Sequence, residues 1–399
     1  MSWSAKRLDQ LGTVSRGRSR HRPRDAEHLY GGPHPFIQTG DVKHAGLYIT
    51  SFTQTYTETG LAQSKLWPAG TLCITIAANI ADTAILGIDA CFPDSVIGFI
   101  ADPKKADTRF VKYLFDATIK IRAQQFSQGA TQDNLSQEKL LSLEFEIPEV
   151  EQQKRIADIL SSYDDLVENN RRRMALLEDS AQQLYREWFV HLRFPGHEHT
   201  PIVDGVPQGW KKVRVDELGT VLTGKTPSTK DADNYGGDIQ FVKTPDMHGN
   251  AFVLQTETQL TEKGAKSQAN RFLPPGALLV SCIGTVGVVS LTSELCQFNQ
   301  QINAVIPMED FLRYYSYFAL KDLKPRLDAI GGGVTMANVS KSKFESMDVL
   351  RPTSALLRNF DEFSGPVFNQ IKVLGQQNQK LRQARDLLLP RLMNGELAV

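Results

Sequence analysis

The stretch GTVLTGKT, residues 219–226, fits the G-x-x-x-x-G-K-[ST] pattern of a phosphate-binding loop. In such a loop, backbone N–H groups cradle phosphates, the lysine neutralises charge and the hydroxyl holds Mg²⁺. This chemistry needs a buried strand before the loop and a helix directly after it. Here a half-polar run precedes the loop, and Pro227 with an Asp/Asn/Gly cluster follows it. The context therefore argues against a nucleotide site.

A second pattern imitates a metal-dependent nuclease. A Pro-Asp pair ends at Asp94, and a D-P-K triplet begins at Asp102. In nucleases of this kind, acidic residues bind Mg²⁺ and a lysine assists the attacking water. The proline inside the triplet is an awkward interruption, so the pattern is weak. The chain also has no adenine-methyltransferase (N/D)-P-P-(Y/F) motif and no glycine fingerprint for a cofactor.

Composition narrows the class of protein. The chain has 399 residues, a hydrophobic share of 41%, a charged share of 23% and a formal net charge of +0. These values are ordinary for a globular protein of two or three domains, and the net charge gives no argument for nucleic acid. The apolar runs are too short to cross a bilayer, and the first residues do not resemble a signal peptide, so we expect a cytoplasmic protein.

The cysteines and histidines do not predict a metal site. Four cysteines lie far apart without a C-x-x-C pair, and we expect buried, reduced thiols at Cys73, Cys91, Cys282 and Cys296. His197 and His199 form an H-x-H pair in a Pro/Gly-rich stretch without further ligands nearby. This is typical of a solvated linker.

An internal repeat offers a better explanation of the opening motif. WKKVRVDELGTVLTG at 210–224 aligns with WSAKRLDQLGTVSRG at 3–17, an offset of 207 residues (210 − 3). Tyr-Gly-Gly then recurs at 30–32 and 235–237. Further matched pairs are Phe36/Phe241, Asp41/Asp246, Thr131/Thr335, Asn134/Asn338, Ser136/Ser340 and Pro148/Pro352. We therefore interpret the apparent phosphate-binding loop as one half of a repeated structural motif.

Each repeat begins with a mixed part and ends with a helical part. The mixed part has short β-rich runs, many turns, and helices expected at 110–121 and 311–323. In the helical part, residues spaced alternately four and three apart form a stripe from Ile156 to Trp188, and the matching stripe runs from Phe360 to Leu392. Such a heptad stripe is typical of a coiled coil. Pro366 predicts a break or kink near the start of the second helix.

These segments resemble the DNA-specificity subunit of type I restriction–modification enzymes, over essentially the whole chain. The strongest parts are the helical segments IPEVEQQKRIADILSSYDDLVENNRRRMALLEDSAQQLYREWFVHLRFPG and QNQKLRQARDLLLPRLMNGEL. The W-x(7)-LG-x(4)-G openings, GKTPS, NYGGDIQFVKTPDM and FNQQINAVIP also resemble the family's recognition domains. None is a catalytic motif, so the match rests on their ordered combination and on the duplication. The first repeat departs with RGRSRHRP where GKTPS is typical, so we expect its tip to contact DNA differently.

The resemblance implies an α/β (α+β) fold with two duplicated, mixed target-recognition domains separated by a long antiparallel two-helix coiled coil. The expected boundaries are 1–150 for the first recognition domain, 151–192 for the first helix, 193–210 for a linker, 211–350 for the second recognition domain and 351–399 for the second helix. Each domain would read one half of a split DNA site. Similar modules related by a pseudo-two-fold suit two half-sites whose spacing follows protein geometry.

The family also implies partners and cofactors. The helices would hold two adenine-N6 methyltransferase subunits, and ATP-dependent restriction/translocase subunits would complete the enzyme. This chain would be non-catalytic and would carry no cofactor of its own. S-adenosylmethionine, ATP and Mg²⁺ are expected on the partner subunits.

Candidate DNA-binding residues lie mainly in two equivalent loops. Arginine suits phosphate contacts and bidentate readout of guanine, although a solvated basic loop is the alternative. For the Thr/Asn pairs, turn capping is an equally good explanation. The candidates are Arg16, Arg18, Arg20, Arg22, Arg24, Lys43, Thr131, Asn134, Lys225, Thr226, Ser228, Lys230, Lys243, Thr335 and Asn338.

Candidate partner-binding residues lie on the first long helix. Arg171, Arg172 and Arg173 fall mostly off the heptad stripe, where a solvated face is the alternative to methyltransferase docking. Trp188 and Phe189 end the helix and suit either core packing or an aromatic anchor.

Two rival functions remain open from the sequence: a helical scaffold that does not bind DNA, and a Mg²⁺-dependent nuclease. Salt-dependent, sequence-selective duplex binding would exclude the scaffold, and activity with Mg²⁺ alone would identify the nuclease.

Overall fold

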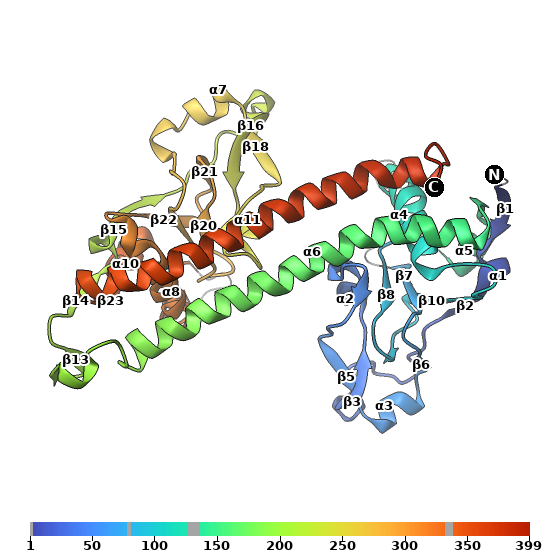
Figure 1. The fold of residues 1–399 in the computed structure, drawn as a ribbon, viewed down its shortest axis with the longest axis horizontal. Helices are drawn as coiled ribbons and strands as arrows, with labels where there is room; N and C mark the ends of the chain where they lie inside the picture. Colours follow the sequence, from blue (N-terminus) through green and yellow to red (C-terminus); the bar gives the residue numbers. More distant parts are fainter. Residues whose placement is uncertain (1–2, 78–80, 127–135, 332–337) are drawn as a thin grey trace. The chain divides into compact units, whose positions relative to one another are not determined.

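The computed structural model describes residues 3–77, 81–126, 136–331 and 338–399. The chain divides into two compact units, one formed by Met1–Asn169 with Asn378–Val399 and the other by Asn170–Gln377. Each unit contains one mixed α/β domain and a part of both long helices, α6 (Val150–Tyr185) and α11 (Ser354–Met393) (Figure 1).

The first α/β domain is mainly two small sheets with short helices around them. Its strands are β1 (Ser4–Arg7), β2 (Gly12–Arg16), β3 (Tyr30–Phe36), β4 (Tyr48–Ile49), β5 (Gln54–Tyr56), β6 (Leu66–Trp67), β7 (Leu72–Thr75), β8 (Thr83–Leu86), β9 (Ala90–Cys91), β10 (Val96–Ala101) and β11 (Glu144–Ile147). Its helices are α1 (Leu8–Leu11), η1 (Glu27–Leu29), α2 (Thr39–His44), α3 (Glu58–Ala62), α4 (Thr108–Phe126) and α5 (Gln137–Ser142). The strand orders are β2-β10-β7-β8-β4 and β5-β3-β9-β6, and β1 pairs with β11.

A short connection precedes the second domain. It contains η2 (Arg186–Val190), η3 (His197–His199) and the hairpin of β12 (Ile202–Val203) and β13 (Val206–Pro207). Strands of the second domain are β14 (Lys211–Arg214), β15 (Gly219–Thr223), β16 (Tyr235–Val242), β17 (Phe252–Val253), β18 (Thr258–Leu260), β19 (Leu278–Ser281), β20 (Val289–Thr292), β21 (Cys296–Phe298), β22 (Ile302–Pro307) and β23 (Asp348–Arg351). Its helices are η4 (Val215–Glu217), η5 (Ala232–Asn234), η6 (Thr244–Met247), α7 (Glu262–Lys266), η7 (Ala269–Arg271), η8 (Asp310–Leu312), α8 (Arg313–Asp322), α9 (Lys324–Gly331) and α10 (Lys341–Glu345).

The two domains share one topology. The order β15-β22-β19-β20-β17 repeats β2-β10-β7-β8-β4, and the β14–β23 pair repeats β1–β11. The sheet β18-β16-β21 repeats β5-β3-β9, and a bridge between Leu273 and Cys296 takes the place of the β6–β9 pairing. The repeat in the sequence is therefore a repeat of the fold, as predicted. The helices expected at 110–121 and 311–323 are α4 and η8 with α8.

The repeated Tyr-Gly-Gly motif forms a strand irregularity in both domains. The register of β3 against β5 shifts after Tyr30, and that of β16 against β18 shifts after Tyr235. Gly31 and Gly236 both have φ of +87°, in the left-handed region that glycine adopts without steric cost. The motif is therefore conserved between the repeats for a backbone reason.

The apparent phosphate-binding loop also has a structural explanation. Gly219 opens an antiparallel strand, β15, and the next element is the short η5 rather than a long helix. A Cβ at Gly219 or Gly224 would lie 2.0 Å from a carbonyl oxygen of the neighbouring backbone. At the equivalent Gly12 and Gly17 that separation is 2.2 Å. These glycines permit close approach of two chain segments, so the structural interpretation of the motif is confirmed.

The long helices pack antiparallel within each unit. In the first unit, Ile156 near the start of α6 and Leu392 near the end of α11 belong to one buried core. In the second unit, Tyr185 at the end of α6 and Phe360 near the start of α11 lie with ring centroids 6.4 Å apart. The predicted antiparallel pair is confirmed in each unit separately.

Of the break or kink predicted at Pro366, the break is wrong, because α11 continues from Ser354 to Met393 without interruption. Proline inside a helix loses one N–H donor and costs about 3 kcal/mol. Phe360 and Phe368 are fully buried on either side of it, and their packing offsets that cost. The hydroxyl of Ser364 also donates a 2.7 Å hydrogen bond to the carbonyl of Phe360.

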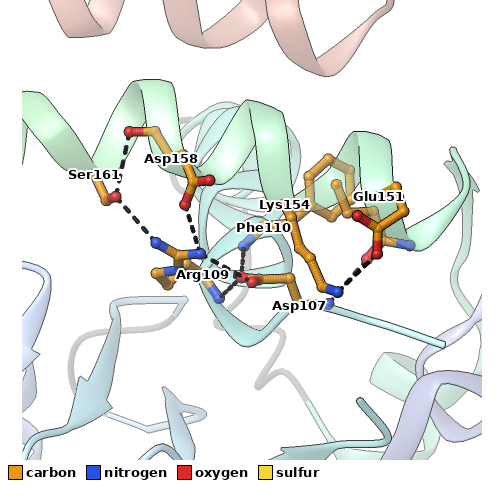
Figure 2. A network of polar contacts seen from close by, with 8 residues as sticks. Asp107, Arg109, Phe110, Glu151, Lys154, Asp158 and Ser161 are labelled. Atoms are coloured by element: carbon orange, nitrogen blue, oxygen red, sulfur yellow. Dashed lines mark hydrogen bonds and ion pairs between the residues drawn. The ribbon is translucent and has the colours of Figure 1, made fainter. Parts of the chain in front are cut away.

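Ion pairs attach α6 to the first domain, as Figure 2 shows. The guanidinium of Arg109, at the start of α4, lies 3.1 Å from Asp107 and 2.9 Å from Asp158 of α6. The Asp107 carboxylate also accepts the N–H groups of Arg109 and Phe110 at 2.8 and 3.2 Å, and so caps α4. The Asp107 side chain thus caps the start of α4 and also pairs with Arg109, which in turn reaches Asp158 of α6.

A buried polar cluster lies between α4, α6 and α11 in the first unit. The hydroxyl of Tyr113 donates to Asp164 at 2.5 Å, and Arg385 of α11 forms an ion pair with the same carboxylate. The side-chain amide of Asn378 donates to the carbonyl of Val167 at 3.2 Å. Polar groups in an apolar stripe fix the register of paired helices.

All four cysteines are buried free thiols, as predicted. Burial raises the pKa of Cys282 to about 11 and that of Cys296 to about 12. Within the described parts of the chain, no helix combines the length and apolar character needed to span a membrane.

Candidate DNA interface

The first candidate loop, residues 17–24, is attached to the turn that follows β9. The N–H of Arg18 donates to the carbonyl of Phe92 at 3.0 Å, and the Arg16 side chain donates to the carbonyl of Asp94 at 3.0 Å. Arg24 donates to both carboxylate oxygens of Asp94, at 2.8 and 2.9 Å. Asp94 therefore binds arginines from both ends of the loop, and Arg16 and Arg24 take part in its structure.

Two hydroxyl groups hold the loop from the other side. Ser64 donates to the carbonyl of Arg18 at 2.7 Å, and Tyr30 donates to the carbonyl of Arg24 at 2.7 Å. Burial, followed by the neighbouring Tyr56, raises the pKa of Tyr30 to about 12. The Tyr30 hydroxyl thus remains a donor at neutral pH.

Arg22 is also used internally, whereas Arg18 and Arg20 are not. The guanidinium of Arg22 donates to the carbonyls of Ser19 and His21, both at 2.8 Å. The side chains of Arg18 and Arg20 are exposed and meet no partner among the residues that the structure describes. All five arginines of the predicted run are exposed, and these two are the ones whose side chains make no hydrogen bond or ion pair to a described residue.

The second candidate loop, residues 224–230, lies in the same place of the second domain. The N–H of Lys225 donates to the carbonyl of Phe298 at 3.0 Å, which repeats the bond between Arg18 and Phe92. The hydroxyl of Thr226 donates to the side-chain oxygen of Gln300. The loop is therefore joined to residues 298–300, as its counterpart is joined to residues 92–94.

Tyrosine again holds the loop. The hydroxyl of Tyr235 donates to the carbonyl of Pro227 at 2.7 Å, and the side-chain amide of Asn234 donates to the carbonyl of Ser228 at 3.0 Å. Lys225 and Lys230 are exposed, and their ammonium groups have no partner within the described ranges. The two loops thus share one construction despite their different sequences.

The other candidates are placed less centrally. Lys43 is exposed on α2, and Lys243 is half-buried at the N-cap of η6, where its N–H donates to Asp246 at 2.8 Å. The equivalent bond joins Gln38 to Asp41, also at 2.8 Å, which explains the repeated aspartate. Asn338 is exposed and bridges to Ile283. Thr131, Asn134 and Thr335 lie outside the described residues.

The candidate partner-binding residues differ in exposure. Arg171, Arg172 and Arg173 are exposed on α6, and Trp188 is half-buried. Phe189 is only 6% exposed and packs against Trp210 and Phe360 in the core of the second unit. Packing, the alternative that the sequence left open, accounts for Phe189, and we do not include it in a partner surface.

The nuclease-like acids have other roles. Asp94 forms the ion pair with Arg24, and Asp102 accepts the N–H of Lys104 at 3.0 Å. The described residues contain no cluster of three or more His, Cys, Asp or Glu side chains suited to a metal ion.

Sequence reasoning missed Gln300, Ser64 and the two tyrosines as parts of these loops. Gln300 lies 74 positions from Thr226, and Ser64 lies 46 positions from Arg18, whereas the tyrosines lie only 6 and 8 positions from the residues they hold. The signal that could have identified the tyrosines was already visible, since Tyr-Gly-Gly recurs in both repeats.

Two copies of one α/β domain, each with its own polar loop, make this a duplicated protein. Residues 2–179 and 207–354 match the family described as the type I restriction modification DNA specificity domain. The chain belongs to this family, and it is a specificity subunit with two target-recognition domains. The family consists of non-catalytic DNA-recognition proteins.

Individual relatives agree with this placement. The chain is 29% identical over 333 residues to the type I restriction enzyme HindI specificity subunit of Haemophilus influenzae, covering 68% of this chain and 72% of that protein. It is 24% identical over 412 residues to the MjaIX specificity subunit of Methanocaldococcus jannaschii, covering 100% and 94%. The crystal structure of the S subunit from M. genitalium shares its fold, with a TM-score of 0.57 at 15% identity over 98% of this chain and 96% of that one.

Proposed function

We propose that each domain reads one half of a bipartite duplex DNA site and that the two half-sites differ. The observation that carries this proposal is one strand framework, repeated in both domains, whose side chains differ widely between the few residues that the two repeats share. Direct readout depends on side-chain identity at each groove edge, so different side chains on a shared framework suit different base sequences.

Within this proposal, the long helices hold two adenine-N6 methyltransferase subunits, and ATP-dependent restriction/translocase subunits join the assembly. S-adenosylmethionine, ATP and Mg²⁺ are bound by those partners, and the complex acts in the cytoplasm. Exposed apolar side chains on the helices support a partner surface. They are Leu166 and Leu387 in the first unit, and Leu176, Phe363 and Val373 in the second.

A matched pair of substitutions tests the partner surface. Leu176 is 70% exposed on α6, and Leu295 is 57% exposed in the connection between β20 and β21 of the second domain. We expect Leu176→Glu to reduce co-purification of the methyltransferase subunits and Leu295→Glu to leave it unchanged, because a charge opposes burial at an interface. Equal co-purification by both variants would reject the helical surface. The chain made without partners is expected to be poorly soluble.

Methylome sequencing of cells that carry the chain with its methyltransferase partner tests the proposed recognition. A two-part methylated motif that appears only with this chain is the expected result. The full chain should also bind duplexes with that motif in a salt-dependent way. A stable complex with partners but no selective duplex binding would favour the scaffold, and cleavage by the chain with Mg²⁺ alone would favour a nuclease.

A further inference from the structure

Both candidate loops direct hydrogen-bond donors outward and use many of their acceptors internally. In the first loop, side chains of the domain occupy five carbonyls, those of Arg18, Ser19, His21, Pro23 and Arg24. In the second loop, the carbonyls of Pro227 and Ser228 are occupied in the same way. Side chains thus occupy carbonyls in both loops, five in the first and two in the second.

The groups left over include four cations and one side-chain amide. Arg18 and Arg20 in the first loop, and Lys225 and Lys230 in the second, are exposed without a partner among the described residues. Gln300 adds a neutral donor, because Thr226 donates to its side-chain oxygen and the exposed amide nitrogen has no described partner. A surface of this kind matches a ligand that presents only acceptors.

A phosphate group and the major-groove edge of guanine both present only acceptors. Reading guanine requires an arginine or lysine held in a fixed bidentate geometry. The arginines that the structure does hold in place, Arg16, Arg22 and Arg24, donate to groups within the domain. The outward cations are not fixed by described neighbours, which suits contact with phosphate as a charge.

We propose that residues 17–24 and 224–230, with Gln300, grip the phosphate backbone of DNA and position each domain without reading bases. This proposal rests on the proposed function, since it assumes that these faces meet duplex DNA. It gives the two loops a shared role despite their different sequences, and it assigns base selection to other parts of each domain.

Salt dependence of binding tests the proposal. The double variants Arg18→Ala/Arg20→Ala and Lys225→Ala/Lys230→Ala are compared with Lys104→Ala and Lys211→Ala, which remove exposed lysines elsewhere in the same domains. Each full chain is assembled with its methyltransferase partner. Affinity for the methylated motif and for a scrambled duplex is then measured over a range of salt concentrations.

Removing one phosphate contact should make the plot of log K against log salt concentration less steep by about 0.9. Each double variant removes two such contacts, so its plot should be less steep by about 1.8. Affinity should fall equally for the motif and the scrambled duplex, and the methylated motif should stay unchanged. Gln300→Ala removes a neutral donor, and it should lower both affinities with little change in slope. The lysine controls should keep the wild-type slope.

Two results would overturn the phosphate assignment while the wild-type chain still binds its motif. One is a methylated motif that relaxes at a guanine, which would make these side chains base readers. The other is an unchanged slope in both double variants. Failure of the wild-type chain itself to bind any motif selectively is a different outcome, because it rejects the proposed function before the variants are compared.

Discussion

The hydroxyl of Tyr235 donates a 2.7 Å hydrogen bond to the carbonyl of Pro227, and Tyr30 makes the same 2.7 Å bond to Arg24 in the other domain. Both tyrosines begin a Tyr-Gly-Gly bulge, so a motif that bends a strand also places a hydroxyl against a loop. The framework is the same in both domains, while the loop that it holds differs in sequence.

Removing one of these hydroxyls should loosen one loop only. For Tyr235→Phe we expect DNA affinity to fall about five-fold, because one neutral hydrogen bond contributes roughly 1 kcal/mol. The measurement is the dissociation constant of the assembled complex on its motif. Tyr48→Phe is the control, because Tyr48 is 40% exposed at the start of β4 and lies in neither loop. Equal affinity for both variants would contradict the role given to Tyr235.

Alkaline pH provides a second test of the tyrosine in the first domain. Burial raises the pKa of Tyr30 from 10.0 to about 12. The folded state therefore binds this proton more tightly than the unfolded state does, so the stabilisation is complete below pH 10 and is lost as pH rises toward about 12.

We expect the free energy of unfolding of the wild-type chain to fall more steeply between these pH values than that of Tyr30→Phe. Denaturant unfolding of both chains at each pH measures the difference. Ionisable groups that do not contact Tyr30 are the same in both chains and cancel in the comparison. Parallel pH profiles would show that Tyr30 does not contribute.

The Asp164–Arg385 pair should be important for stability of the first unit. The Asp164 side chain is 8% exposed and that of Arg385 is 24% exposed. Asp164→Ala would leave the Tyr113 hydroxyl without its acceptor and the Arg385 guanidinium with Asp386 alone, and we expect a loss of about 2 kcal/mol in the free energy of unfolding. Glu151→Gln, which breaks an exposed pair with Lys154 on the same helix, should change little. Similar effects in both variants would contradict the account of the buried cluster.

The sequence predicted the duplicated topology and the helix pair because both leave periodic or repeated signals. It could not predict the loop attachments, since Arg24 and Asp94 lie 70 residues apart and nothing local marks them as partners. At Pro366 the prediction of a break was wrong for a different reason, because it relied on a local rule alone. A local rule was overridden by the burial of Phe360 and Phe368 around it.

A longer helix should change the spacing of the proposed DNA site. Four residues inserted between Asn170 and Leu177 of α6 add about one turn, or about 5–6 Å of helix. We expect methylome sequencing to show a longer spacer with both half-sites unchanged, because the helices would set distance without touching bases. Altered bases in either half-site would contradict this division of roles.

Separate readout by two domains is the central claim, and a domain exchange tests it most directly. Residues 1–150 are replaced by the first recognition domain of another member of the family, and the methylated motif is determined by methylome sequencing. We predict that one half of the motif changes and the other half stays the same, because direct readout resides in the exchanged side chains. A change in both halves, or loss of methylation by a chimera that still folds and binds its partners, would contradict the account.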